Sequence, residues 1–325
     1  MKWYNISEKA GKLRAFNIII GGRGIGKTYS AINYIITSGK PFIYLRNTDV
    51  QISESCTDFG NPFKTWARDH MRDIYIKKQG KHANIYERRG EDLPQLLGYA
   101  AALSTAGNLR GVDLSEVEFI LFDEFIEKTP LKFKQFDAFM NFYETVSRNR
   151  ELLGRDPLKV IMLSNAQKLD NEILHALGLI PQIESMIKSG QADYSSGSVY
   201  LNLPKSAVSE AKKNTAAYMA ANGSAFYKEA LQNEFANDNF AGIGKRPITE
   251  YRGICRLDDV YIYRHKSDGS YYCCSVRCEN VPEYSSRIPF LFVRYTAPKL
   301  ARAYARNKLY FSDFVVKSKI IKYIL

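Results

Sequence analysis

The most chemically specific stretch of the sequence lies at residues 21–28 and satisfies the phosphate-binding pattern G-x-x-x-x-G-K-[ST] in full. Glycines in such a loop let backbone N–H groups surround nucleotide phosphates, and the helix that follows adds a positive partial charge. We expect Lys27 to reach the β- and γ-phosphates and Thr28 to coordinate Mg²⁺. The nucleotide-binding residues predicted from the pattern are Gly21, Gly22, Arg23, Gly24, Ile25, Gly26, Lys27 and Thr28.

A second candidate group is the adjacent pair Asp123 and Glu124, which ends the apolar run 119–122. A carboxylate at the end of a buried strand can coordinate the Mg²⁺ that accompanies a nucleotide, and this role suits Asp123. Glu124 can polarise the attacking water, as a general base or by orienting it. Because the sequence also lacks the N-K-x-D pattern of guanine recognition and the G-x-G-x-x-G loop of dinucleotide-binding proteins, we predict ATP hydrolysis.

Two further residues have side chains suited to the γ-phosphate. Asn165 follows the apolar run 160–163 and suits a polar sensor between Mg²⁺ and the γ-phosphate, with an ordinary strand-end turn as the alternative. Arg148 ends a helical pattern, and its planar, permanently charged guanidinium suits stabilisation of charge in the transition state. Capping of the helix C-terminus is the alternative for this arginine.

A mostly parallel sheet is expected to carry these residues. The apolar run 15–20, the helical spacing of residues 27–37 and the apolar run 41–46 predict a strand–helix–strand unit, which implies parallel strands. The other elements predicted in this part are strands over 117–122, 160–163 and 197–203 and a helix over 133–146.

The segment 50–110 is predicted to be an insertion into this α/β domain. Within it the sequence predicts a hairpin, formed by residues 73–77 and 84–88 around a turn at 79–81, and a short strand at 100–104.

The predicted secondary structure changes after Pro204. Two polar helices are predicted over 205–221 and 224–235, and the remaining chain is rich in strand patterns. Its predicted elements are strands over 259–264, 271–276 and 290–295 and a helix over 298–307. The predicted domains are 1–204 as the P-loop ATPase domain, 205–237 as a helical linker and 238–325 as a compact basic α+β domain.

The chain carries a formal charge of +12, and this charge is unevenly placed. Residues 236–325 hold 16 Lys and Arg against 8 Asp and Glu, whereas the first 235 residues hold 30 against 26. Such a basic region attracts a polyanion, either nucleic acid or an acidic protein face, although a solvated basic surface is the alternative. Five loosely spaced cysteines and the lack of a long apolar run predict a reduced, cytoplasmic protein.

Taken together, the motifs resemble those of the DNA-packaging (encapsidation) ATPases of small tailed phages with protein-primed genomes. The similarity covers roughly residues 15–170 and includes the order and spacing of the motifs as well as the chain length. The motifs that carry it are G-G-R-G-I-G-K-T at 21–28, F-I-Y-L-R at 42–46, I-L-F-D-E-F at 120–125, T-V-S-R-N-R at 145–150 and L-S-N-A at 163–166.

This resemblance implies an ASCE-class P-loop ATPase of the FtsK/HerA-like branch, assembled as a homopentameric ring. In the family the first arginine of R-N-R acts on a neighbouring subunit's site, which implies this role for Arg148, and Arg23 helps to read the γ-phosphate state. The resemblance further implies an RNase H-like, vestigial nuclease domain at the C-terminus that docks on the portal, a packaging RNA or DNA. The expected location is the host cytoplasm, with transient attachment to the procapsid portal vertex.

The expected function is therefore ATP-driven translocation of double-stranded DNA into a procapsid. Two alternatives stay open: a ring-forming DNA helicase or conjugation-type pump, and a nucleotide-gated scaffold without significant turnover, against which the presence of Glu124 argues. Phosphate contacts that are independent of base sequence are expected for any such motor. The candidate DNA-facing cations are Arg110, Lys128, Lys132 and Lys134.

Nuclease activity is not expected of the C-terminal region, because an active site would need several carboxylates converging on divalent metal. The acidic residues available there are Asp258, Asp259, Asp268, Glu279, Glu283 and Asp313.

Overall fold

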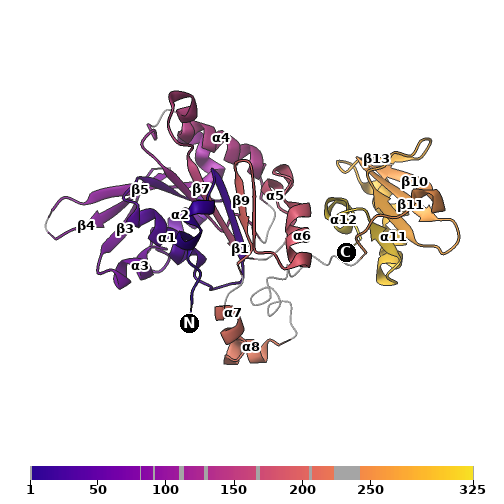
Figure 1. The fold of residues 1–325 in the computed structure, drawn as a ribbon. Helices are drawn as coiled ribbons and strands as arrows, with labels where there is room; N and C mark the ends of the chain where they lie inside the picture. Colours follow the sequence, from indigo (N-terminus) through magenta and orange to yellow (C-terminus); the bar gives the residue numbers. More distant parts are fainter. Residues whose placement is uncertain are drawn as a thin grey trace. The chain divides into compact units, whose positions relative to one another are not determined.

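The fold is described from a computed structural model of the 325-residue chain. It divides into two compact units: unit 1 comprises Met1–Ile173 and Met186–Asp238, and unit 2 comprises Leu174–Ser185 and Asn239–Leu325. Figure 1 shows the elements of both. The structure describes residues 2–80, 82–90, 92–109, 113–127, 131–165, 169–204, 207–222 and 242–324.

The strand–helix–strand unit predicted at the start of the chain is confirmed. Strand β1 (Phe16–Gly21) is almost wholly buried, and its one polar side chain, Asn17, donates to the carbonyls of Arg14 and Val160. Strand β2 (Phe42–Arg46) is buried up to its last residue. Helix α1 (Lys27–Thr37) connects them and buries Ile32, Ile35 and Ile36 on one face.

Unit 1 is built on a nine-stranded sheet with the order β3-β4-β5-β2-β6-β7-β1-β9-β8. The neighbours from β5 to β9 are all parallel, and antiparallel pairs occur only at the two ends. Strand β7 lies between β1 and β6, which is the strand order of the ASCE class. The further strands are β3 (Asp73–Gln79), β4 (His82–Arg88), β5 (Gln95–Ala102), β6 (Phe119–Asp123), β7 (Lys159–Asn165), β8 (Asp193–Ser196) and β9 (Val199–Asn202).

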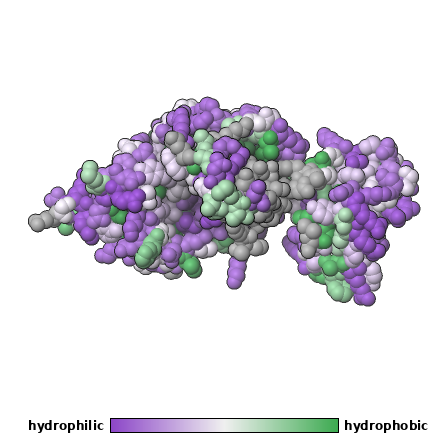
Figure 2. Space-filling view, turned by 90° about the horizontal axis from the view of Figure 1, so that it is seen from below, coloured by the Kyte–Doolittle hydropathy of each residue, from purple (hydrophilic) through white to green (hydrophobic). Residues whose placement is uncertain are grey.

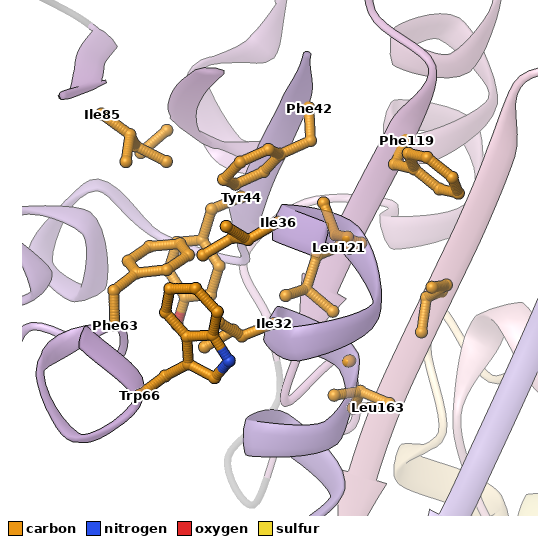
Figure 3. Close-up of a cluster of buried hydrophobic side chains, with 14 of the residues drawn as sticks. Ile32, Ile36, Phe42, Tyr44, Phe63, Trp66, Ile85, Phe119, Leu121 and Leu163 are labelled. Carbon is orange, nitrogen blue, oxygen red and sulfur yellow. The ribbon is translucent and has the colours of Figure 1, made fainter. Parts of the chain in front are cut away.

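Helices cover both faces of this sheet. On one face, α1 and α3 (Lys64–Asp69) enclose a core in which Phe63 packs edge-on to Tyr44 with ring centroids 5.7 Å apart (Figure 3). On the other face, Phe139 of α4 (Gln135–Ser147) stacks on Phe122 at 5.8 Å. Successive side chains of a strand point to opposite faces, so Leu121 belongs to the first core and Phe122 to the second.

The segment predicted as an insertion extends the main sheet. The hairpin is confirmed as β3 and β4, with Tyr75 opposite Tyr86 and their rings 5.6 Å apart. The strand predicted at 100–104 was wrong in its bounds, because β5 begins at Gln95 and pairs with both β4 and β2. A short 3₁₀ stretch, η2 (Leu103–Leu109), follows it.

The segment after β9 differs from the single helix predicted over 205–221. It contains two short helices, α7 (Ala207–Lys212) and α8 (Ala216–Ala220), separated where Thr215 adopts an extended backbone with φ −89° and ψ 152°. The predicted helix 224–235 lies outside the described residues.

Unit 2 contains a five-stranded mixed sheet with the order β13-β10-β11-β12-β14, backed by helices, so the predicted α+β class is confirmed. The core joins Ile262 and Cys273 of the sheet to Leu300 and Ile320 of two helices. RNase H-like topology stays a prediction. The elements are β10 (Tyr251–Leu257), β11 (Val260–His265), β12 (Tyr271–Cys274), β13 (Glu283–Tyr284), β14 (Leu309–Phe311), α10 (Phe290–Tyr295), α11 (Ala297–Ala305) and α12 (Phe314–Ile321).

The strand predicted at 290–295 was wrong, because these residues form helix α10. A strand that buried Phe290 and Phe292 would also turn Arg294 toward the core, since alternate residues share a face. The helix avoids this by burying Phe292 fully while Phe290 and Arg294 remain exposed. The apolar composition of the run was therefore misleading.

The other features of the fold are its cysteines, its surface and several short helices. All five cysteines are free thiols. Within the described ranges, no helix combines the length and apolar character needed to span a bilayer. Hydrophilic residues dominate the face shown in Figure 2, with small apolar groups between them. The elements not yet named are η1 (Ile6–Lys12), α2 (Asp49–Ser55), η3 (Arg150–Leu153), α5 (Glu172–Ala176), α6 (Ile180–Ser189) and η4 (Ile248–Glu250).

Candidate nucleotide site

The loop between β1 and α1 borders a cavity of about 300 Å³. Gly26 caps the helix with φ 96°, a left-handed conformation that favours glycine, and Ile25 is fully buried beneath the loop. The N-terminal N–H groups of α1 have no partners within the helix, which makes this end suited to an anion. The cavity is lined by Arg23, Gly24, Gly26, Lys27, Thr28, Tyr29, Asp123, Glu124, Leu163, Ser164 and Asn165.

Lys27 is buried at the first turn of α1, and its ammonium group has three acceptors. Nζ donates to the carbonyl oxygens of Gly21 at 2.9 Å and Gly22 at 2.7 Å. It also donates to Oδ1 of Asn165 at 3.1 Å, which brings the proposed sensor to the lysine. Burial lowers the pKa of Lys27 to about 8, although Asp123 and Glu124 act in the opposite direction. A polyanion beside this group would restore its preference for the charged form.

Asp123 lies at the end of β6 and faces the hydroxyl group of Thr28. Thr28 Oγ1 lies 3.2 Å from Oδ1 and 3.4 Å from Oδ2 of the carboxylate, and the Tyr44 hydroxyl lies 3.5 Å from Oδ2. Burial raises the pKa of Asp123, and the neighbouring Glu124 charge adds to that effect. A divalent cation would relieve this cost, and carboxylate and hydroxyl oxygens are ligands that Mg²⁺ prefers. Thr28 and Asp123 therefore fit a Mg²⁺ site.

Glu124 occupies an unusual backbone conformation with φ 51°. Non-glycine residues in this region cost free energy and concentrate at functional sites. Oε2 of Glu124 accepts a hydrogen bond from Nη2 of Arg46 at 2.7 Å, and Nη1 of the same arginine donates to Tyr44 at 3.2 Å. The glutamate is thus held at the mouth of the cavity by a side chain from the adjacent strand.

Arg46 was not among the predicted site residues. The only signal in the sequence was its place at the end of the F-I-Y-L-R strand. The parallel register, in which Leu45 lies opposite Phe122, brings the ends of β2 and β6 together.

The two arginines of the R-N-R motif have different environments. Arg150 is buried, with its side chain only 3% exposed; Nη2 pairs with Glu118 at 2.6 Å and Nη1 donates to the carbonyl of Val117 at 2.8 Å. Arg148 ends α4 with φ 46°, and its side chain is 43% exposed beside Asp113 at 3.3 Å. Arg148 does not line the nucleotide cavity of its own chain.

A larger cavity of about 570 Å³ adjoins the phosphate loop. It shares Gly26 and Tyr29 with the first cavity, and an N-terminal segment that sequence reasoning left out provides part of its wall. That segment is fixed by a hydrogen bond from the Tyr4 N–H to the carbonyl of Ile25 at 3.0 Å. The lining residues are Trp3, Tyr4, Asn5, Gly26, Tyr29, Ser30, Asn33, Thr65 and Asp69.

Unit 2 carries a cationic cavity of about 340 Å³. Five exposed cations line it against one carboxylate, that of Asp268. Lys308 is oriented within it by donating to the carbonyl of Asp268 at 3.0 Å. The five cations are Arg264, Lys299, Arg302, Arg306 and Lys308.

Three of the carboxylates of unit 2 make structural contacts. Asp313 caps α12 by accepting from the N–H of Val316 at 2.9 Å, and Asp259 pairs with Lys319 at 2.6 Å. Glu283 pairs with Arg256 at 3.2 Å. Among the residues that the structure describes, no group of three or more His, Cys, Asp and Glu side chains is arranged to hold a metal ion.

The predicted DNA-facing cations are only partly described. Lys132 and Lys134 are exposed, and Lys134 lies 3.7 Å from Asp137. Arg110 and Lys128 lie outside the described residues.

Comparison with known proteins agrees with this geometry. A family model described as podovirus DNA encapsidation protein (Gp16) matches residues 1–252. A DNA packaging protein of Bacillus phage B103 is 29% identical over 241 residues, covering 72% of this chain and 68% of the relative. One from Bacillus phage phi29 is 27% identical over 252 residues, covering 75% and 69%.

Solved structures give a shared fold over nearly the whole chain. The bacteriophage Phi-29 viral genome packaging motor assembly contains a chain with a TM-score of 0.65 at 22% identity, covering 99% of both chains. The Phi-28 gp11 DNA packaging motor matches with a TM-score of 0.59 at 18% identity, covering 99% of this chain and 98% of the other.

Proposed function

The chain belongs to the podovirus DNA encapsidation protein (Gp16) family and is a genome-packaging motor protein, and we propose that it hydrolyses Mg²⁺-bound ATP to drive double-stranded DNA into a procapsid. The family match confirms the resemblance inferred from the motifs. The observation that carries the proposal is the convergence of Lys27, Thr28, Asp123, Glu124 and Asn165 on one cavity.

Each of these residues has a chemical role in the proposal. Lys27 neutralises the β- and γ-phosphates, and Asn165 holds the lysine while sensing the γ-phosphate. Thr28 and Asp123 hold Mg²⁺, which supplies charge neutralisation to the phosphates when bound. Glu124 orients the attacking water and accepts its proton, and Arg46 fixes the carboxylate in position. The left-handed backbone at Glu124 sets the direction of its side chain.

The two adjoining cavities suit the two ends of ATP. The phosphate loop supports the triphosphate, and the shared residues Gly26 and Tyr29 lead to the larger cavity. That cavity combines the aromatic side chains Trp3 and Tyr29 with the polar groups of Asn5 and Asn33, a combination that suits a nucleobase and its ribose.

Arg148 completes a neighbouring subunit's site in this proposal. Its exposure, its left-handed backbone and its absence from the cavity of its own chain favour action across an interface. Arg150 is excluded from that role because it is buried against Glu118 and Val117. Catalysis across the interface requires a head-to-tail contact between subunits, and we propose that these contacts close into a homopentameric ring at the portal vertex.

DNA and the portal are the proposed partners, with a packaging RNA as a further one. Contacts to duplex phosphates would pass any sequence, as a packaging motor must. The exposed Lys132 and Lys134 of unit 1 and the cationic cavity of unit 2 are the proposed phosphate-facing surfaces. We keep the division into an ATPase domain at 1–204, a helical linker at 205–237 and a C-terminal domain at 238–325 as part of the proposal.

Mixing two inactive variants tests the catalytic proposal. Arg148→Ala and Glu124→Gln subunits each lack one half of the site, so each alone should release phosphate at a strongly reduced rate. A mixed ring contains interfaces in which an intact Arg148 faces an intact Glu124, and partial recovery of phosphate release is expected. Wild-type turnover no faster than that of Glu124→Gln would support a nucleotide-gated scaffold instead.

A further inference from the structure

The chain that leaves the main sheet of unit 1 passes back over the phosphate loop. Pro204 follows β9 and packs so closely on Gly21 that a Cβ atom there would lie 2.8 Å from its Cγ. Eight residues later, Nζ of Lys212 donates to the carbonyl of Arg23 at 2.7 Å. A Cβ atom on Gly24 would lie 2.5 Å from the same Nζ. The following segment therefore contacts the loop at its first residue, Gly21, and in its middle, at Arg23 and Gly24.

Lys212 is also connected to the helices on its own side. It is the last residue of α7, its carbonyl accepts from the Thr215 hydroxyl at 2.9 Å, and its ammonium lies 5.8 Å from the centre of the Tyr218 ring in α8. A change in the position of the Lys212 ammonium group would thus alter contacts made by both α7 and α8.

The electrostatic setting of Lys212 is unfavourable for a cation. Burial lowers its pKa, and the guanidinium of Arg23 lowers it further. Lys212 in turn contributes to lowering the pKa of Lys27. The loop cations Arg23 and Lys27 and the adjoining Lys212 therefore lie close to one another, and a bound polyphosphate would relieve their mutual repulsion.

We propose that Lys212 is a nucleotide-responsive tether: its ammonium adds to the positive charge that holds the polyphosphate and couples nucleotide binding to the position of α7 and α8. The inference rests on the proposed function, because it assigns a regulatory contact to the same phosphate site. A bound anion strengthens the hold of the ammonium on the loop, which orders the two helices. By linkage, the same helices stabilise the bound nucleotide.

A purely structural role for Lys212 makes a different prediction. A lysine that only satisfies the carbonyl of Arg23 would affect stability, and its removal would change affinity for nucleotide little. Coupling, by contrast, requires that nucleotide binding alter α7 and α8 and that this response disappear without the ammonium.

The test uses the full-length protein and ATPγS as the probe. Lys212→Met keeps the aliphatic stem over Tyr218 and removes the charge, and Lys212→Arg keeps the charge. Lys213→Met is the matched control at the residue directly after α7, where Lys213 pairs with Glu210 at 2.6 Å. We expect Lys212→Met to weaken ATPγS binding about tenfold, the scale of one charge-assisted contact, with Lys212→Arg recovering part of it and Lys213→Met within about twofold of wild type.

Hydrogen exchange of residues 207–222 provides the second readout. ATPγS should protect this segment in wild type and in Lys213→Met but not in Lys212→Met. Wild-type affinity in Lys212→Met, or protection that persists in it, would overturn the inference. If wild-type protein neither bound ATPγS nor hydrolysed ATP, the proposed function itself would fail; normal binding and hydrolysis with an indifferent Lys212 would reject only the tether.

Discussion

Units 1 and 2 differ in how deeply their functional charged side chains are buried. Unit 1 buries Lys27, Asp123 and Arg150 inside its fold, where an unpaired charge is costly. Unit 2 places most of its cations on the surface, with Lys317 as a buried exception beside Phe311, and uses several of its carboxylates for caps and ion pairs. The comparison teaches that a buried charge needs a particular partner or ligand, whereas a surface charge tolerates many. The candidate site of unit 1 is therefore made of a few charged residues with particular partners. The cationic surface of unit 2 consists of exposed charges that could interact with many partners.

The largest effects are expected when the two arginines of the R-N-R motif are replaced, because one is exposed and the other is buried. Arg148→Ala should lower phosphate release about 10³-fold, the scale of an arginine that stabilises transition-state charge, with thermal stability unchanged. Arg150→Ala should instead lower the free energy of unfolding by about 1–3 kcal/mol, because the carbonyl of Val117 would lose its buried donor while Glu118 would keep Arg155 as a partner. Denaturant unfolding and steady-state phosphate release separate the two. Equal loss of stability in both variants would contradict the distinction.

A second variant tests whether the partly buried Arg46 positions the carboxylate of Glu124. Arg46→Ala frees Glu124 from its 2.7 Å contact, and a misplaced base should reduce turnover about 100-fold. Affinity for ATPγS should change little, because Arg46 does not line the phosphate cavity. The Arg46→Lys control keeps a charge but not the two-pronged geometry, so it should recover only part of the rate. Full activity in Arg46→Ala would remove Arg46 from the site.

Most residues of the candidate site in unit 1 could be predicted from the sequence. Lys27 and Thr28 were predictable from the complete phosphate-binding pattern, and Asp123 and Asn165 were predictable because each follows an apolar run whose end is visible in the sequence. The structure shows that these residues line one cavity. Their chemical roles stay predictions.

Other residues were missed for physical reasons. Arg46 depends on the register of β2 against β6, and Lys212 contacts a loop that lies 189 residues away, counted to Arg23. Neither relation leaves a local pattern. In unit 2, helix α10 was mistaken for a strand because its apolar and aromatic composition resembles that of a strand, although the run lacks the alternation that a half-buried strand requires.

The electrostatic surface of unit 2 can be tested by charge reversal. The double variant Arg302→Glu, Arg306→Glu should weaken binding of the full-length protein to duplex DNA about tenfold and reduce the salt dependence by about two released ions. Phosphate release in the absence of DNA should be unaffected. Arg287→Glu is the control, an exposed arginine outside the cationic cavity. An unchanged salt slope in the double variant would show that this cavity does not face DNA phosphates.

The smallest expected effect is a pH dependence of nucleotide binding, and it arises from the buried charge of unit 1. The pKa of Lys27 is lowered to about 8 by burial, and bound phosphates would raise it again. Above pH 8 the free protein has lost this proton, so binding must take one up, and affinity should fall by up to about tenfold per pH unit. Calorimetry of ATPγS binding at pH 8.5, in two buffers with different ionisation enthalpies, measures the uptake. Lys27→Arg remains charged throughout this range, so it should bind without proton uptake even if more weakly. Uptake that persists in Lys27→Arg would assign the proton to another group.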